Sequence, residues 1–304
     1  MNLLEPAILT IITAATPLLL AAIGELVTER SGVLNLGVEG MMAMGAACAF
    51  AIAITTDSSL IGVLGGVGAG VALAALFALM TLGFAANQVA CGLALTILGL
   101  GLSGLVGADF VGARRDAMPK LWIEGLSDIP FIGPILFGQD AFVYASFVLV
   151  AGVWWFLFRT RAGLTLRAVG DNHVSAHALG SKVLRVRLWA VLFGGGCAGL
   201  AGAYLSLVYT PFWVDGMTAG RGWIALAIVV FSSWLPGRLV IGAYLFGSVS
   251  ILQLYAQGAG IGLPSQLMSS LPYLVTIVVL VAIAGTRARA RAPACLGVPF
   301  VPDR

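Results

Sequence analysis

The stretch that decides the fold spans residues 24–45 and reads GELVTERSGVLNLGVEGMMAMG. Acidic, basic and amide side chains crowd here between two strongly apolar runs: Glu25, Glu29, Arg30, Asn35 and Glu39. Lipid offers such groups no hydrogen-bond partners, so a membrane segment that carries them must satisfy them within the protein or line a wet cavity. We therefore expect residues 31–45 to form an interrupted membrane helix beside a solute pathway.

The whole chain has the composition of a polytopic membrane protein. Of its 304 residues, 60% are hydrophobic and 10% are charged, whereas soluble domains carry about 25% charged residues. A membrane helix needs about 20 apolar residues. This rule predicts an all-α membrane helical bundle with about nine spans, near 6–27, 33–55, 60–83, 87–107, 141–158, 188–209, 223–236, 239–257 and 270–286.

The basic residues predict how the chain is oriented. Cytoplasmic loops of membrane proteins are enriched in Lys and Arg. Residues 159–187 hold six basic residues and one acid, and residues 287–304 are also basic. Both segments are therefore predicted to be cytoplasmic, which places the N-terminus and the loop 108–140 outside. We expect residues 1–286 to form one membrane domain, followed by a basic, disordered tail.

Polar and glycine residues interrupt a second span at 210–223, which reads TPFWVDGMTAGRGW. The first break follows a span that runs inward, and the second follows a span that runs outward. Paired interruptions in oppositely oriented halves indicate the binding region of a transporter. Asn35 and Glu39 are four residues apart, so we expect them to share a helical face and to hydrogen-bond a polar, uncharged solute. In the alternative interpretation, Glu39 pairs with a neighbouring helix and only fixes the packing.

Six further residues complete the predicted solute path. They are Asn87, Gln88, Phe212, Trp213, Arg221 and Trp223. The two amides open the span 87–107 and either line the path or cap the helix. Phe212 and Trp213 either stack on a flat ring of the solute or belong to an aromatic belt at the membrane interface.

The predicted cytoplasmic loop contains a short helix. Residues 165–187 read TLRAVGDNHVSAHALGSKVLRVR. Asp171 or Asn172 is a good N-cap and Gly180 a good C′ residue, which leaves a helix of about eight residues between them. A short helix held between two membrane spans can transmit force from a separate protein that drives transport. The residues predicted to couple in this way are Asp171, Asn172, His173, Ala176, Ala178, Leu179 and Gly180.

The chain lacks the motifs of an enzyme. It has no GxxxxGK pattern followed by Ser or Thr, so a different chain would hydrolyse any ATP that drives it. Neither GxSxG nor HExxH is present. His173 and His177 have the spacing of a metal pair, but no third ligand is near them and we predict no metal. We also predict no nucleic-acid partner.

Several motifs match a family of transporters. They lie at residues 24–40, 87–88, 92–95, 170–172, 178–180, 185–187, 198–204 and 220–227. On these residues the chain resembles the inner-membrane permeases of bacterial ABC importers for simple sugars, branched-chain amino acids and nucleosides, and in particular the nucleoside branch.

The resemblance implies a set of partners. These are a second related permease in a heterodimer, a cytoplasmic ATPase that binds ATP and Mg²⁺, and an external solute-binding protein or lipoprotein. It also implies a bacterial plasma membrane, no cofactor in this chain, a coupling role for residues 170–187, and a nucleoside or simple sugar as solute. The competing hypothesis is a self-sufficient secondary transporter or channel that uses Glu25 or Glu39 for proton coupling.

Overall fold

The computed structural model describes residues 4–121, 132–258 and 292–301 and a few short pieces between them. Its helices are α1 (Leu4–Arg30), α2 (Val38–Thr56), α3 (Ser59–Ala78), α4 (Gln88–Gly107), α5 (Ile132–Phe137), α6 (Ala141–Arg159), α7 (Arg161–Asp171), α8 (His173–Ala178), α9 (Val183–Tyr204), α10 (Arg221–Phe231) and α11 (Pro236–Gly258). One π-helical turn follows α3 at Leu79–Gly83 and another follows α9 at Leu205–Tyr209. The described residues form no named strand, which confirms the all-α prediction.

Seven of these helices are long and apolar enough to cross a membrane, namely α1, α2, α3, α4, α6, α9 and α11. Each matches one of the predicted spans. The span predicted at 223–236 is the shorter apolar helix α10, which has 11 residues. The span predicted at 270–286 falls outside the described residues, apart from a few positions.

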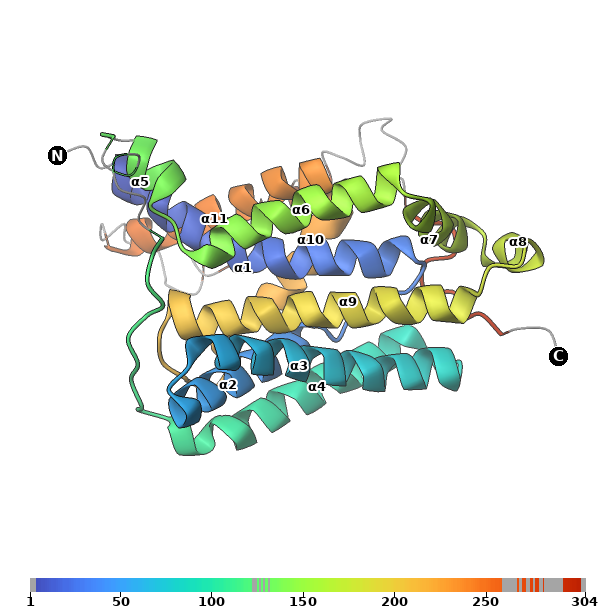
Figure 1. Ribbon diagram of the computed structural model, residues 1–304, viewed down its shortest axis with the longest axis horizontal. Helices are drawn as coiled ribbons and strands as arrows, with labels where there is room; N and C mark the ends of the chain where they lie inside the picture. The colour runs from blue at the N-terminus through green and yellow to red at the C-terminus, as the bar shows by residue number, and fades with distance from the viewer. Residues whose placement is uncertain are drawn as a thin grey trace.

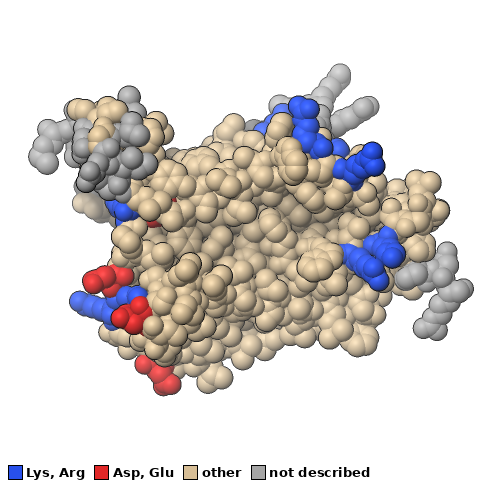
Figure 2. Space-filling view, viewed as in Figure 1, with Lys and Arg blue, Asp and Glu red and all other residues tan. Residues whose placement is uncertain are grey.

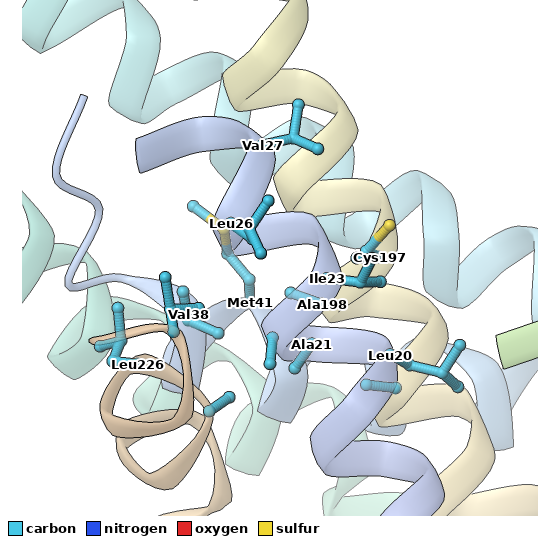
Figure 3. Close-up of a cluster of buried hydrophobic side chains, with 14 of the residues drawn as sticks. Leu20, Ala21, Ile23, Leu26, Val27, Val38, Met41, Cys197, Ala198 and Leu226 are labelled. Carbon is cyan, nitrogen blue, oxygen red and sulfur yellow. The ribbon is translucent and has the colours of Figure 1, made fainter. Parts of the chain in front are cut away.

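The core lies where α1, α2 and α9 meet. In Figure 1, α1 and α9 run side by side through the middle of the bundle, with α2, α3 and α4 on one side and α6, α10 and α11 on the other. Figure 3 shows side chains from α1, α2, α9 and α10 in this core, among them Leu26, Met41 and Leu226. The helices approach closely because glycine stands at their contacts: a Cβ at Gly202 of α9 would overlap the carbonyl oxygen of Met42 of α2.

Charge is distributed unevenly between the two ends of the bundle. In the view of Figure 2, the end that carries α7 and α8 shows basic side chains, whereas acidic side chains appear at the opposite end, beside a few basic ones. The described part of the C-terminal tail also lies near α7 and α8 (Figure 1). This arrangement agrees with the positive-inside reasoning; the orientation itself stays a prediction.

Part of the C-terminal tail is ordered. Its composition predicts disorder, but residues 292–301 pack against the loop that carries α7 and α8: the Cys295 amide donates to the Gly170 carbonyl at 2.9 Å, and the Phe300 side chain is buried. The prediction of disorder is therefore wrong for these ten residues. Residues 292–301 carry no charged side chain, and Phe300 provides their buried apolar anchor.

Candidate functional site

The first break separates α1 from α2. Gly32, with a φ of 88°, ends the first helix, and α2 starts only at Val38. Asn35 lies inside this break and not on a helix, so the prediction that it shares a helical face with Glu39 is wrong. Its side-chain oxygen instead accepts a hydrogen bond from the Gly37 amide at 2.9 Å, and the Asn35 side chain is fully buried.

The second break separates α9 from α10. The π-helical turn Leu205–Tyr209 ends the long helix, and the chain resumes a helix at Arg221. Gly216 and Gly220 have backbone φ angles of 70° and 81°, which residues with a Cβ rarely adopt. These glycines let the chain turn back so that the N-terminus of α10 faces α2.

Glu39 joins the two breaks. Its carboxylate accepts hydrogen bonds from the Thr218 hydroxyl at 2.6 Å, the Gly220 amide at 2.9 Å and the Gly222 amide at 2.6 Å. Glu39 lies in the first turn of α2, so the N-termini of two interrupted helices converge on one carboxylate. Helix N-termini favour negative charge because their amides lack intrahelical partners. Gly222 permits this approach, since a Cβ there would lie 2.6 Å from the Glu39 backbone.

These contacts are the ones that the packing interpretation of Glu39 expects. Glu39 is 4% exposed, and both of its carboxylate oxygens have donors from the second break. We call this arrangement of Glu39, Thr218, Gly220 and Gly222 the Glu39 junction. In the described conformation it ties the two interrupted segments together.

Two buried polar atoms flank the first break without a hydrogen-bond partner among the described residues. Glu25 accepts from the Asn35 amide with one oxygen at 3.2 Å, and its other oxygen has no partner. Gln88 accepts from the Leu34 amide at 2.8 Å, and its side-chain nitrogen has no partner. Buried polar groups normally have partners. This pair therefore offers one acceptor and one donor beside residues 34–35.

The end of α1 is held by a residue that the sequence did not single out. The Trp234 indole donates to the Glu29 carboxylate, and the Trp234 carbonyl accepts from Arg30 at 2.8 and 3.1 Å. Trp234 lies in the turn between α10 and α11, so this contact is a second link between the first break and the second half of the chain. Trp234 and Glu29 are 205 residues apart in sequence, so no local pattern indicates that they are hydrogen-bonded.

The other predicted path residues have varied surroundings. Asn87 caps α4 by accepting from the Ala90 amide at 3.0 Å, as the capping alternative expects. Trp213 is buried in an apolar cluster and Phe212 is 43% exposed. Arg221 lies over the Tyr209 ring at 5.2 Å. Trp223 packs, partly buried, against the main core.

The predicted short helix in the loop is α8. The Asn172 side chain accepts from the Ser175 amide at 2.9 Å, so Asn172 and not Asp171 is the N-cap. Gly180 has the predicted left-handed φ of 85°. The helix has six residues, fewer than expected, and a second helix that was not predicted, α7, precedes it.

The predicted coupling residues fall into two sets. His173 and Ala176 are buried against the protein, whereas Leu179 is 87% exposed; Asp171 and Ala178 are also exposed. His173 and His177 both pack edge-on against the Phe300 ring. Burial and the nearby Arg187 lower the pKa of His173. In the described part of the chain, no three His, Cys, Asp or Glu side chains are grouped to hold a metal ion.

The fold and site together define a polytopic membrane protein with two broken helices that meet inside the bundle. Residues 7–284 match the family described as "Branched-chain amino acid transport system / permease component". The chain belongs to this family, and it is a permease subunit of an ABC transporter. Family members work in general with an ATPase and a solute-binding protein. They are transport subunits and not enzymes themselves.

Named relatives cover nearly the whole chain. The guanosine ABC transporter permease protein NupQ of Bacillus subtilis is 32% identical over 97% of both chains. The nucleoside ABC transporter permease protein NupC of Lactococcus lactis is 30% identical over 100% of this chain and 99% of its own. TsgC13 of Haloferax volcanii, named "Putative glucose ABC transporter permease protein", is 42% identical over 88% of each chain.

A solved structure shares the fold. It is described as "An inward-facing conformation of a putative metal-chelate type ABC transporter" and is 19% identical, with a TM-score of 0.50, over 91% of this chain and 85% of the other. At this identity the likeness concerns only the arrangement of the helices.

Proposed function

We propose that this chain forms the membrane path of an importer for nucleosides. The support comes from the relatives named for guanosine and nucleosides, which align over 97–100% of this chain. The relative named for glucose supports a second candidate, a simple sugar, because it is 42% identical. Nucleosides and glucose both carry a sugar ring rich in hydroxyl groups. Carboxylate and amide side chains can hydrogen-bond such a ring.

The observation that carries the proposal is the Glu39 junction. Two helix breaks from opposite halves of the chain meet at one buried carboxylate, which is the arrangement expected where a transporter binds its solute. We propose that the path opens when the N-terminus of α10 moves away from Glu39. The carboxylate then exchanges the Thr218 hydroxyl and the two glycine amides for solute hydroxyls. The unpartnered atoms of Glu25 and Gln88 provide an acceptor and a donor near the same break.

The proposed assembly contains four kinds of chain. A second related permease forms a heterodimer with this one, an ATPase binds ATP and Mg²⁺ in the cytoplasm, and a solute-binding protein or lipoprotein delivers the solute from outside. Residues 1–286 form the membrane domain in a bacterial plasma membrane. The N-terminus is outside and the α7–α8 end is cytoplasmic. The exposed side chains of Val174 and Leu179 on the α8 loop are available to the ATPase.

Uptake into proteoliposomes tests this proposal. This chain is reconstituted with its ATPase, its partner permease and its solute-binding protein, and the entry of radiolabelled guanosine is measured with and without ATP. We expect uptake that requires ATP and is competed by other nucleosides. Competition by glucose but not by nucleosides would favour the sugar candidate. Accumulation by this chain alone, without nucleotide, would contradict the proposal and favour a self-sufficient carrier.

A further inference from the structure

Arg187, at the cytoplasmic start of α9, is fully buried although it carries a permanent charge. Its guanidinium contacts three separate parts of the chain. Nε donates to the Ser31 carbonyl at 3.2 Å, Nη1 donates to the Val298 carbonyl at 3.0 Å, and Nη2 lies 3.1 Å from His173 Nδ1. A buried cation is costly unless its donors are satisfied. This geometry therefore holds the first helix break, the C-terminal tail and α8 together.

The C-terminal segment 292–301, which we call the strap, adds contacts of its own to this arrangement. The Cys295 amide donates to the Gly170 carbonyl of α7 at 2.9 Å, and the Gly297 amide donates to the Gly32 carbonyl at 3.2 Å. The strap therefore runs from the loop helices to the residue that ends α1. These backbone contacts do not involve Arg187, so they link the same two regions independently.

The loop helices and the strap share a small apolar core. It consists of Val169 of α7, Ala176 of α8, Val183 of α9 and Phe300 of the strap, each 8% exposed or less. Phe300 also contacts both histidines of α8 edge-on, with ring centroids 5.2 and 5.3 Å apart. Because α8 has six residues and no membrane span of its own, this core and Arg187 set its position relative to α1.

We infer that Arg187 is a positioning residue which, with the strap, links α8 to the first helix break, so that a displacement of α8 by the ATPase moves Ser31 and Gly32. The inference rests on the proposed function and deepens it. Force that enters at the exposed edge of the loop reaches the break through the guanidinium, the strap and the core around Phe300. The Glu39 junction begins a few residues further along the same break.

The first test measures coupling in the full transporter complex. We expect Arg187→Ala to lower ATP-driven uptake at least about tenfold, which is the effect of losing even one of its three hydrogen bonds, while ATP hydrolysis per complex changes by less than about twofold. Arg187→Lys keeps the charge and restores part of the uptake. Arg238→Ala is the matched control, because Arg238 is exposed at the start of α11 and lies outside the loop that carries α7 and α8.

The strap is tested by Phe300→Ala, which we expect to uncouple in the same way as Arg187→Ala. Its control is Val301→Ala, since Val301 is 66% exposed. Unchanged uptake in the Arg187→Ala and Phe300→Ala complexes would overturn the inference. The inference would also be overturned if uptake and ATP hydrolysis both fell in proportion to the amount of assembled complex, because Arg187 and Phe300 would then have a purely structural role.

A second measurement does not depend on transport. In a chain whose other three cysteines (Cys48, Cys91 and Cys197) are replaced by Ala, the rate of maleimide labelling at Cys295 reports whether the strap is docked. We expect Arg187→Ala to speed this labelling at least about tenfold and Arg238→Ala to leave it unchanged. Equal rates in all three proteins would overturn the link between Arg187 and the strap. A complex without ATP-dependent uptake would instead count against the proposed function and leave this labelling test valid.

Discussion

Thr218 and Glu39 allow a graded test of the junction between the two halves of the chain. Thr218→Val keeps the volume of the side chain but removes the 2.6 Å hydrogen bond from the Thr218 hydroxyl to the Glu39 carboxylate. A hydrogen bond to a charged group contributes about 1.5–3 kcal/mol, and lipid supplies no replacement donor. We therefore expect Thr218→Val to lower the free energy of unfolding by about this amount.

Glu39→Ala is the stronger perturbation of the same junction. It leaves the Gly220 and Gly222 amides buried without an acceptor. Each buried unsatisfied donor costs about 1–3 kcal/mol, so the two amides together cost about 2–6 kcal/mol. The loss of stability in Glu39→Gln should fall between those of the other two variants. The glutamine side chain keeps one oxygen acceptor, but its amide nitrogen is a donor and faces another donor.

The assay is unfolding in mixed detergent micelles, followed by far-ultraviolet circular dichroism as the fraction of denaturing detergent rises. The matched control is Thr81→Val. Thr81 is 2% exposed, and its hydroxyl donates within its own helix to the Phe77 carbonyl at 2.8 Å. Similar losses of stability in Thr218→Val and Thr81→Val, or a smaller loss in Glu39→Ala than in Thr218→Val, would refute the reasoning.

Three further predictions concern packing, pH and the loop. Gly202→Leu should abolish the yield of folded protein in size-exclusion chromatography, because a Cβ there overlaps the Met42 carbonyl oxygen, whereas Gly68→Leu, with open space around it, should not. The lowered pKa of His173 means that its protonation favours the unfolded state, so the unfolding temperature should fall as pH drops below about 6.5. The fall in unfolding temperature should be smaller in His173→Asn than in the unsubstituted protein, and equal falls would contradict a role of His173 in this pH dependence. Asn172→Ala removes the cap of α8, at a cost of about 1 kcal/mol; uptake per ATP hydrolysed should drop, and an unchanged ratio would contradict a coupling role for this helix.

Local signals in the sequence predicted much of the fold. Apolar runs gave the membrane helices because the bilayer imposes both their length and their composition. The caps of α8 were also predictable, since Asn172 and Gly180 act through bonds and angles within a few residues. The position of Asn35 was not, because the helix pattern does not show that the break extends from Gly32 as far as Gly37.

The partners in the site depend on long-range packing. Glu39 and Thr218 are 179 residues apart in sequence, and no periodicity relates them. From the sequence alone, Arg187 is one of several basic residues of the predicted cytoplasmic loop. Its complete burial depends on carbonyl groups from two distant segments and on the ring of His173. The strap is equally hard to predict, since the basic residues 287–291 favour disorder and the short apolar segment 292–301, with two prolines, has the period of neither a helix nor a strand.

The proposed transport path requires the Glu39 junction to open during transport, and the accessibility of Thr218 tests this most directly. Thr218 is 1% exposed at rest. In the reconstituted complex carrying Thr218→Cys, with the four native cysteines replaced, a small charged thiol reagent reports whether water reaches this position. We expect slow labelling at rest and fast labelling when ATP and nucleoside are both present. Labelling that stays as slow during ATP-driven uptake as at rest would contradict the proposed path.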